Sequence, residues 1–142
     1  MRILAIDHGQ KNLGLAISDE TGMIARPLGV LSHTSKLVDA AQVAEQAVRQ
    51  AADLIIVGIS YDEAGEPNMS GRQVLNFVEV LRQQTDLPIT LWDESLTTQD
   101  ARAARIAAGA PRKKRAGHLD DVAAAVLLQD YLNQHLPNPH EN

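Results

Sequence analysis

The chain contains no cysteine, which excludes a disulfide framework, a zinc site built from Cys ligands and thiol catalysis. Aromatic residues are also scarce: one Trp, two Tyr and one Phe among 142 residues leave little flat surface on which bases could stack. No apolar run approaches membrane-spanning length, and no basic segment precedes a cleavage site near the N-terminus. We therefore expect a cytoplasmic protein without a membrane partner.

Positive charge is in the minority, because 13 Lys and Arg face 18 Asp and Glu and give a formal net charge of −5. This balance argues against a general nucleic-acid coat protein. The dense basic run is Arg112, Lys113, Lys114 and Arg115, which could hold a phosphate backbone or form a solvated loop. The length and the 44% hydrophobic content suit one globular domain, expected over residues 1–136, followed by a disordered polar tail at 137–142.

The spacing of apolar residues predicts the element order βββ-α-β-α-β-α-α. Pro27 indicates that the third strand lies at an edge or contains a bulge. Three strands in a meander, followed by alternating helices and parallel strands, predict an α/β fold whose mixed five-stranded sheet carries helices on both faces. The expected strands are 3–7, 13–19, 23–31, 54–59 and 87–92, and the expected helices are 37–52, 74–84, 97–109 and 119–134. Residues 61–71 and the basic run are expected to be loops.

Three carboxylates occupy special places in this pattern. Asp7 ends the first strand, Glu94 follows the fifth strand, and Asp120 opens the last helix. Because parallel strands bring their carboxyl ends to one rim, the three acids could meet there as oxygen ligands for Mg²⁺ or Mn²⁺. Two such ions about 4 Å apart support phosphodiester hydrolysis. The alternative is that these acids are ordinary turn and helix-start residues, and Asp121 could replace Asp120 as a ligand.

Four segments in order resemble one family, the YqgF (RuvX-like) pre-16S rRNA nucleases and Holliday junction resolvase-like proteins. The segments are Asp-His-Gly-Gln-Lys-Asn-Leu-Gly near the start, Val-Gly-Ile-Ser with a later Asn-Met-Ser-Gly, Trp-Asp-Glu-Ser-Leu-Thr-Thr, and Leu-Asp-Asp-Val-Ala-Ala with Leu-Leu-Gln-Asp-Tyr-Leu. The resemblance runs almost from end to end. It implies a ribonuclease H-like fold and a metal-dependent nuclease that acts on structured RNA, in 5′-end processing of pre-16S rRNA within a ribosomal precursor.

The resemblance also implies a site. Carried over by position, the catalytic and metal-binding acids are Asp7, Glu94 and Asp120, with Mg²⁺ or Mn²⁺ as cofactor. The chain departs from the family pattern where Asn12 and Ser95 replace the usual Arg and where Ser60 replaces the usual Pro. Basic groups elsewhere could compensate as nucleic-acid contacts, namely Lys11, Arg72, Arg102, Arg105, Arg112, Lys113, Lys114 and Arg115.

Other functions stay open on the sequence. A DNA junction as substrate would require two symmetric nicks and hence a dimer, whereas no clear dimer face is visible and a monomer or weak homodimer is expected. The opening segment also resembles actin-like ATPases and sugar kinases, which need a second domain. A non-catalytic ribosome-assembly or transcription factor is the third alternative. His8 and His118 are candidate proton carriers, although a surface position is the more ordinary one for His8.

Overall fold

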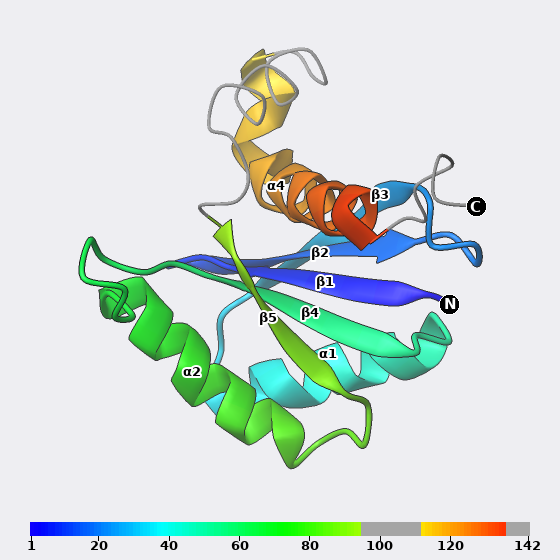
Figure 1. The fold of residues 1–142 in the computed structure, drawn as a ribbon. Coiled ribbons are helices and arrows are strands. Elements are labelled where there is room, and N and C mark those ends of the chain that lie inside the picture. The colour runs from blue at the N-terminus through cyan, green and yellow to red at the C-terminus, as the bar shows by residue number, and fades with distance from the viewer. Residues whose placement is uncertain (95–111, 136–142) are drawn as a thin grey trace.

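The computed structural model describes residues 1–94 and 112–135, with the backbone alone for 112–119. Its five strands form one sheet in the order β3-β2-β1-β4-β5 (Figure 1). The β1–β2 and β2–β3 pairs are antiparallel, and the β1–β4 and β4–β5 pairs are parallel. The predicted mixed sheet is confirmed. The elements are β1 (Ile3–His8), β2 (Asn12–Ser18), β3 (Ala25–Ser32), α1 (Lys36–Arg49), β4 (Leu54–Ile59), α2 (Met69–Arg82), β5 (Ile89–Asp93) and α4 (Arg112–His135).

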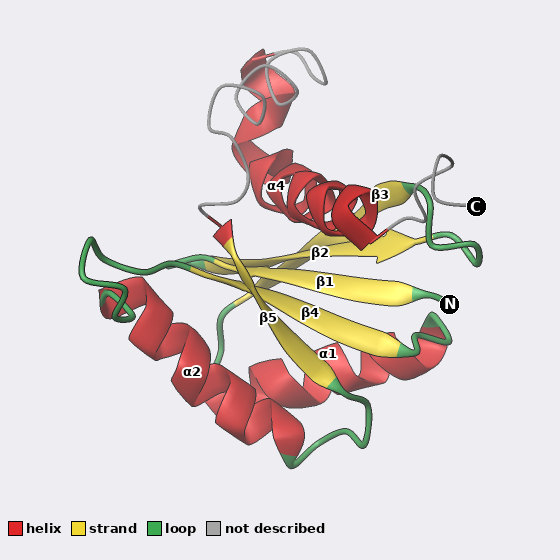
Figure 2. Ribbon diagram, in the orientation of Figure 1, coloured by secondary structure: helices red, strands yellow, loops and turns green. Residues whose placement is uncertain are grey.

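Helices cover both faces of the sheet, with α1 and α2 on one face and α4 on the other (Figure 2). The alternation along β1 assigns its residues to the two faces, since successive side chains of a strand point to opposite sides. Leu4 and Ile6 join the core under α1 and α2, whereas Ile3 and Ala5 join the core under α4. Asp7 therefore belongs to the α4 face, and the next residue, His8, belongs to the opposite face.

The prediction for Pro27 is confirmed in both of its forms. β3 is an edge strand, and its register with β2 shifts between Leu15 and Ala16. Leu15 pairs with Gly29 and Ala16 pairs with Pro27, so β3 carries one additional residue at Leu28. An edge position and a bulge are the two places where a residue without an N–H costs a sheet little.

The start of α2 was predicted five residues too late, since the helix begins at Met69 inside the expected loop. Asn68 is the N-cap, and its Oδ1 accepts a hydrogen bond of 2.8 Å from the Gly71 N–H. Gly71 lowers helix propensity and so concealed this first turn from sequence reasoning. A Cβ at this position would lie 2.4 Å from the Ser60 carbonyl oxygen, so glycine allows the helix to start directly against the end of β4.

The basic run was predicted as a loop, but the backbone at 112–115 is already helical because α4 begins at Arg112. The apolar pattern predicted a start at residue 119, seven residues too late, because the buried apolar residues of the helix begin at Ala123. Pro111 precedes Arg112 in the sequence, a placement common at the start of a helix. The expected helix at 97–109 and the expected tail at 137–142 lie outside the described residues.

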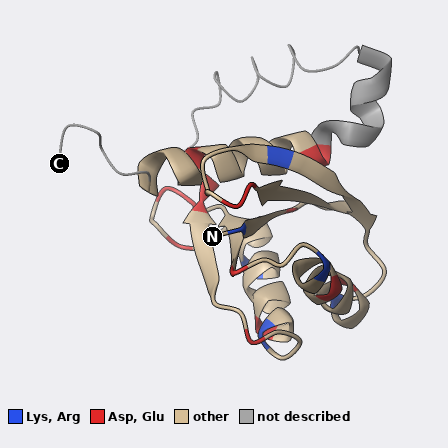
Figure 3. Ribbon diagram, turned by 90° about the vertical axis from the view of Figure 1, so that its right-hand side faces the viewer, with Lys and Arg blue, Asp and Glu red and all other residues tan. Residues whose placement is uncertain are grey.

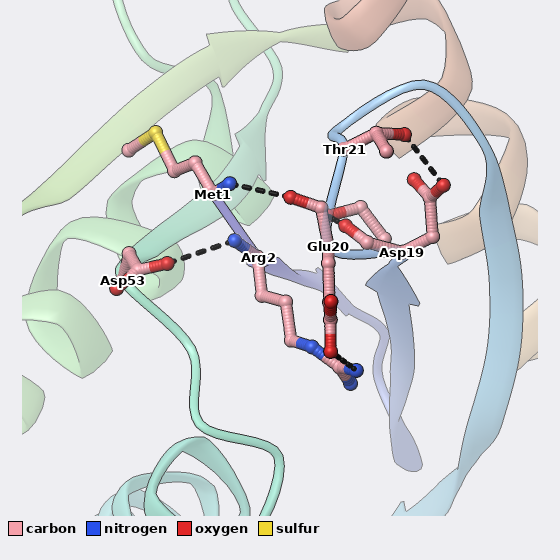
Figure 4. Close-up of polar contacts among 7 residues, drawn as sticks. Met1, Arg2, Asp19, Glu20, Thr21 and Asp53 are labelled. Carbon is pink, nitrogen blue, oxygen red and sulfur yellow. Dashed lines mark hydrogen bonds and ion pairs between the residues drawn. The ribbon is translucent and has the colours of Figure 1, made fainter.

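Polar contacts fix the end of the sheet where β1 begins (Figure 4). The Met1 ammonium donates to the Glu20 carbonyl, and the Arg2 N–H donates to Asp53 Oδ2 at 2.9 Å. In the adjoining turn, the Thr21 hydroxyl and the N–H groups of Ile24 and Met23 donate to Asp19 and lower the pKa of its carboxyl to about 2. Acidic positions gather around this side of the molecule (Figure 3).

No helix among the described residues is long and apolar enough to cross a membrane. The longest of them, α4, instead packs against the sheet through Ala124, Leu128 and Leu132.

Gln129 attaches the start of the edge strand β3 to α4. Its Oε1 accepts from the Ala25 N–H at 3.0 Å, and its Nε2 donates to the Met23 carbonyl at 3.0 Å. These two bonds satisfy backbone groups at the beginning of a strand that has a neighbour on one side only.

Gln129→Ala is expected to lower the free energy of unfolding by about 1–2 kcal/mol, because two hydrogen bonds to backbone groups are removed together. Urea denaturation measures this decrease, and hydrogen exchange should accelerate at the Ala25 amide. Gln42→Ala, an exposed position on α1, is the matched control and should leave both unchanged. Equal stability of the two variants would contradict the role of Gln129.

Candidate active site

Asp7 lies on the α4 face of the sheet between two glycines. In the β1–β2 register it pairs directly with Gly14. On its other side the register that pairs Ile6 with Val57 continues to Gly58 of β4. The two glycines contribute no side chain beside Asp7, so other elements can approach the sheet closely at these positions. We call this part of the sheet, Asp7 with Gly14 and Gly58, the glycine floor.

Gly14 brings Asp120 to this floor. A Cβ at Gly14 would lie 1.9 Å from the Asp120 carbonyl oxygen, so only glycine allows the backbone of α4 to come so near to β2. The Asp120 side chain is held at the same place, because Asn12 Nδ2 donates to its Oδ2 at 3.1 Å. α4 thus delivers a carboxylate next to the partner residue of Asp7.

Gly58 brings Glu94 to the other side. A Cβ at Gly58 would lie 2.7 Å from Glu94 Oε1 and 3.0 Å from Leu127 Cδ2. The Glu94 side chain therefore turns back from the end of β5 and rests on β4 next to α4. The acids Asp7, Glu94 and Asp120, expected at one rim, are all brought to one face of the sheet.

The three acids do not form a closed metal cage. Among residues 1–94 and the described part of α4, no three His, Asp or Glu side chains stand together in an arrangement that could hold a metal ion. Binding a cation between them would require side-chain rotation.

Between the two neighbouring aspartates at the start of the last apolar segment, the structure favours Asp120 as the accessible one. Asp121 is 7% exposed and turns toward the sheet, whereas Asp120 is only partly buried and contacts Asn12 at the surface of the sheet. The alternative of Asp121 as ligand therefore has less support than Asp120.

His8, for which a surface position was the more ordinary expectation, is half-buried and lines an open cavity. Its ring lies 4.9 Å from the His33 ring and 5.2 Å from the Phe77 ring, measured between centroids, on the face away from Asp7. Burial, with the neighbouring His33 adding to it, lowers the pKa of His8. The strand alternation separates His8 from the acids, so adjacency to Asp7 in sequence was misleading. The side chain of His118, the other candidate proton carrier, lies outside the described ones.

Two of the expected nucleic-acid contacts, Lys11 and Arg72, are exposed. Lys11 lies in the turn between β1 and β2, and Arg72 lies in the first turn of α2, just beyond the end of β4. Arg102 and Arg105 lie outside the described residues. Arg112, Lys113, Lys114 and Arg115 form the first turn of α4, of which the backbone is described.

Ser60, one of the departures from the family pattern, has a contact that sequence reasoning did not find. Its hydroxyl donates to Asn68 Oδ1 at 2.9 Å, the same oxygen that caps α2. Ser60 therefore links the end of β4 to the helix start that carries Arg72. The sequence did carry a signal for this contact, namely a serine directly after one strand and, eight residues later, an asparagine suited to cap the next helix.

Solved structures of Holliday junction resolvases share this arrangement of strands and helices. Thermus thermophilus RuvC aligns with a TM-score of 0.60 at 17% identity, covering 94% of this chain and 96% of that one. The fowlpox virus resolvase, solved with Holliday junction DNA, aligns with a TM-score of 0.55 at 18% identity, covering 96% and 100%. The fold is the ribonuclease H-like fold that was expected.

The model of the RuvX family, described as Holliday junction resolvase, matches residues 1–134, and the chain belongs to this family. A relative from Clostridium acetobutylicum is 38% identical over 94% of this chain and 98% of its own length. Another from Thermoanaerobacter pseudethanolicus is 37% identical over 94% and 96%. Both carry the provisional name of pre-16S rRNA nuclease. The family expected from the sequence is confirmed.

The two glycines should respond differently to alanine. Gly14→Ala sets a methyl group against the α4 backbone and is expected to cost about 1–3 kcal/mol of unfolding free energy, as overpacking does. Gly58→Ala meets the flexible ends of Glu94 and Leu127, which yield, so its cost is smaller. Urea denaturation of the two variants tests the order, and a reversed order would contradict this account of the floor.

Proposed function

We propose that this protein is a metal-dependent nuclease that hydrolyses phosphodiester bonds in structured RNA, in the 5′-end processing of pre-16S rRNA. The observation that carries the proposal is the glycine floor. Gly14 and Gly58 flank Asp7 and admit Asp120 from α4 and Glu94 from β5 to the same patch. Carboxylates from separate elements are gathered on one face of the sheet, which brings together oxygen donors of the kind that metal-assisted phosphodiester hydrolysis uses.

The donor set fits a hard divalent cation, Mg²⁺ or Mn²⁺, because all of its oxygens are carboxylate oxygens and the chain offers no sulfur ligand from Cys. Asp7, Glu94 and Asp120 are the residues that would hold it. When bound, such an ion lowers the pKa of a water and neutralises charge that develops on the phosphate oxygens. Asn12 keeps one oxygen of Asp120 in place before any ion arrives.

The phosphate backbone would be held by the basic residues around this patch. Lys11 lies in the β1–β2 turn directly before Asn12, which contacts Asp120, and Arg72 lies in the first turn of α2; both are exposed. The basic run begins the same helix that carries Asp120. The proposed nucleic-acid contacts are Lys11, Arg72, Arg102, Arg105, Arg112, Lys113, Lys114 and Arg115.

The names of the relatives favour rRNA as substrate. A branched DNA junction is the second candidate, supported by the family description and by the resemblance to a fowlpox virus resolvase solved on junction DNA. Junction resolution would need two copies of the chain acting symmetrically. The two candidates share the acidic site and differ in substrate, so one assay separates them.

Asp7→Asn is expected to abolish cleavage of a 5′-extended 16S rRNA fragment while leaving the fold intact, because it removes one anionic oxygen at the centre of the site. The measurement compares wild type and variant on this RNA and on a four-way DNA junction, with Mg²⁺, Mn²⁺ or EDTA. Normal cleavage by Asp7→Asn with Mn²⁺ would contradict the site, and cutting of the junction alone would favour the second candidate.

A second variant, Gly58→Ala, perturbs the site without replacing any of its three carboxylates. Gly58→Ala displaces Glu94 Oε1, which lies 2.7 Å from the added methyl group, and should therefore slow cleavage in a folded protein.

If wild type binds Mn²⁺ but cleaves neither substrate, that result would instead support a non-catalytic assembly factor.

The double variant Lys11→Gln/Arg72→Gln should weaken RNA binding and flatten its salt dependence. The slope of log affinity against log salt is expected to fall by about one for each phosphate that a side chain no longer neutralises. Fluorescence anisotropy between low and moderate salt gives the slope. Arg49→Gln, at the far end of α1 and already paired with Glu45 at 2.6 Å, is the control. An unchanged slope in the double variant would remove both residues from the interface.

A further inference from the structure

The turn between β1 and β2 is fastened at several points. Within the turn, the Gly9 N–H donates to the Asn12 carbonyl at 2.9 Å. From outside the turn, the His33 backbone N–H donates to the Lys11 carbonyl at 3.1 Å, and His33 Nε2 contacts the Gly9 carbonyl at 2.7 Å. A single residue at the end of β3 thus holds two carbonyls of the turn.

His33 also contacts a buried carboxylate. Its Nδ1 lies 2.8 Å from Oδ2 of Asp39, which is 3% exposed in the first turn of α1. The other oxygen of Asp39 accepts from the Thr34 N–H at 3.0 Å. A carboxylate and a carbonyl both accept hydrogen bonds, so the His33 ring satisfies both partners only when both of its nitrogens carry protons. The contact is therefore an ion pair between an imidazolium and a carboxylate.

Of the charged and titratable groups around His33, the Asp39 carboxylate favours this state, whereas positive charge on His8 or Lys36 opposes it. Burial lowers the pKa of His33, but the hydrogen bonds that its ring makes to Asp39 and to the Gly9 carbonyl, together with the negative charge of Asp39, outweigh burial and leave the pKa raised. His8 faces it from β1, and Asp39 and Lys36 face it from α1, around an open cavity of about 340 Å³. α2 contributes Gln73 to this cavity and the Phe77 ring beside His8, neither of which carries charge.

The other end of the same turn reaches the acidic site. Asn12 begins β2, and its side chain lies on the α4 face, where Nδ2 donates to Asp120 Oδ2 at 3.1 Å. The Asn12 backbone is in turn fixed by Gly9 and, through β3, by its pairing with Ser32, the residue before His33. Contacts on one face of the sheet are thus connected to a carboxylate on the opposite face through one turn.

We propose that His33 is a positioning residue: by clamping the turn at Gly9 and Lys11 against Asp39, it fixes Asn12, and Asn12 fixes the Asp120 carboxylate. The inference rests on the proposed function only where it concerns catalysis. The contact between the α4 backbone and Gly14 fixes the position of the Asp120 main chain, but it does not fix the orientation of the Asp120 carboxylate. Asn12 supplies it with a neutral donor, and His33 keeps that donor in place.

The first test uses metal-free protein and NMR. His33→Ala is expected to accelerate hydrogen exchange at the Gly9 amide by about tenfold, because the turn opens locally more often when it is no longer clamped, and to broaden the Asn12 side-chain amide signals. Glu45→Gln, which breaks an exposed ion pair on the same helix α1, is the matched control and should change neither. Unchanged exchange and unchanged Asn12 signals in folded His33→Ala would overturn the proposal.

The second test uses cleavage. His33→Ala and Asn12→Ala should each lower kcat with little change in KM for the RNA, because Asp120 acts on the reacting group and not on the phosphate backbone. In the double variant the two decreases should not multiply, since they interrupt one chain of contacts. Decreases that multiply, or a raised KM alone, would overturn the proposal. If wild type cleaves nothing, the proposed function fails while the NMR test still decides the clamp.

The pH dependence supplies a readout that a merely structural residue would not change. Protonated His33 holds both partners, so the ratio of wild-type to His33→Ala kcat should be highest below pH 6.5, the ordinary pKa of histidine. It should fall as the pH rises through the raised pKa of the folded state. A ratio that stays constant with pH would contradict the imidazolium. If His33→Ala does not fold, His33→Gln, which keeps one donor, replaces it. The ratio of wild-type to His33→Gln kcat should then fall with rising pH in the same way but by a smaller factor. A His33→Gln variant with the kcat of wild type at every pH would overturn the proposal.

Discussion

The contact between the α4 backbone and Gly14 of β2 is the constraint on which the site depends. A helix that packs on a sheet is normally held away from the strand backbone by the side chains that fill the space between them. Here the Asp120 carbonyl occupies the position that any Cβ at residue 14 would need. Because the helix touches the sheet at this point, the short side chain of Asp120 can share a patch with Asp7, which a helix at the usual distance would not permit.

A similar constraint governs the other side of Asp7. Glu94 comes from the end of β5, one strand beyond β4, and has to cross β4 to approach the first strand. Gly58 removes the side chain that would stand in the way. The two glycines give up β propensity and side-chain burial in the centre of the sheet, which costs about 1 kcal/mol each. The three strands β1, β2 and β4 are otherwise mostly buried and apolar, and their burial offsets this cost.

Sequence reasoning recovered what local patterns encode. The mixed five-stranded sheet with helices on both faces followed from alternation and from the ends of apolar runs, and so did the expectation that Asp7, Glu94 and Asp120 come together, whose role as a site stays a prediction. It failed where a residue is chosen for a distant partner. Gly71 was read as a loop residue, because the feature that requires glycine there, the close approach of the Ser60 carbonyl, cannot be seen in the local sequence. The basic run at 112–115 was read as a loop because it precedes the apolar residues of the helix. His33 carried no signal, because its partner Gly9 is 24 residues away.

Asn12 gives a physical meaning to the departure from the family pattern. An arginine at this position would carry a positive charge to Asp120 and compete with a cation for the same carboxylate. An amide holds Oδ2 by a hydrogen bond of 3.1 Å and adds no charge, so the negative charge of the acidic patch remains available for a metal ion. The cost is weaker orientation, since an amide donates to a carboxylate through one nitrogen, whereas an arginine can bind it through two parallel hydrogen bonds. A rigid turn compensates for weak orientation, and the imidazolium of His33, bonded to the carbonyl of Gly9 and to the buried Asp39, supplies that rigidity from the opposite face of the sheet.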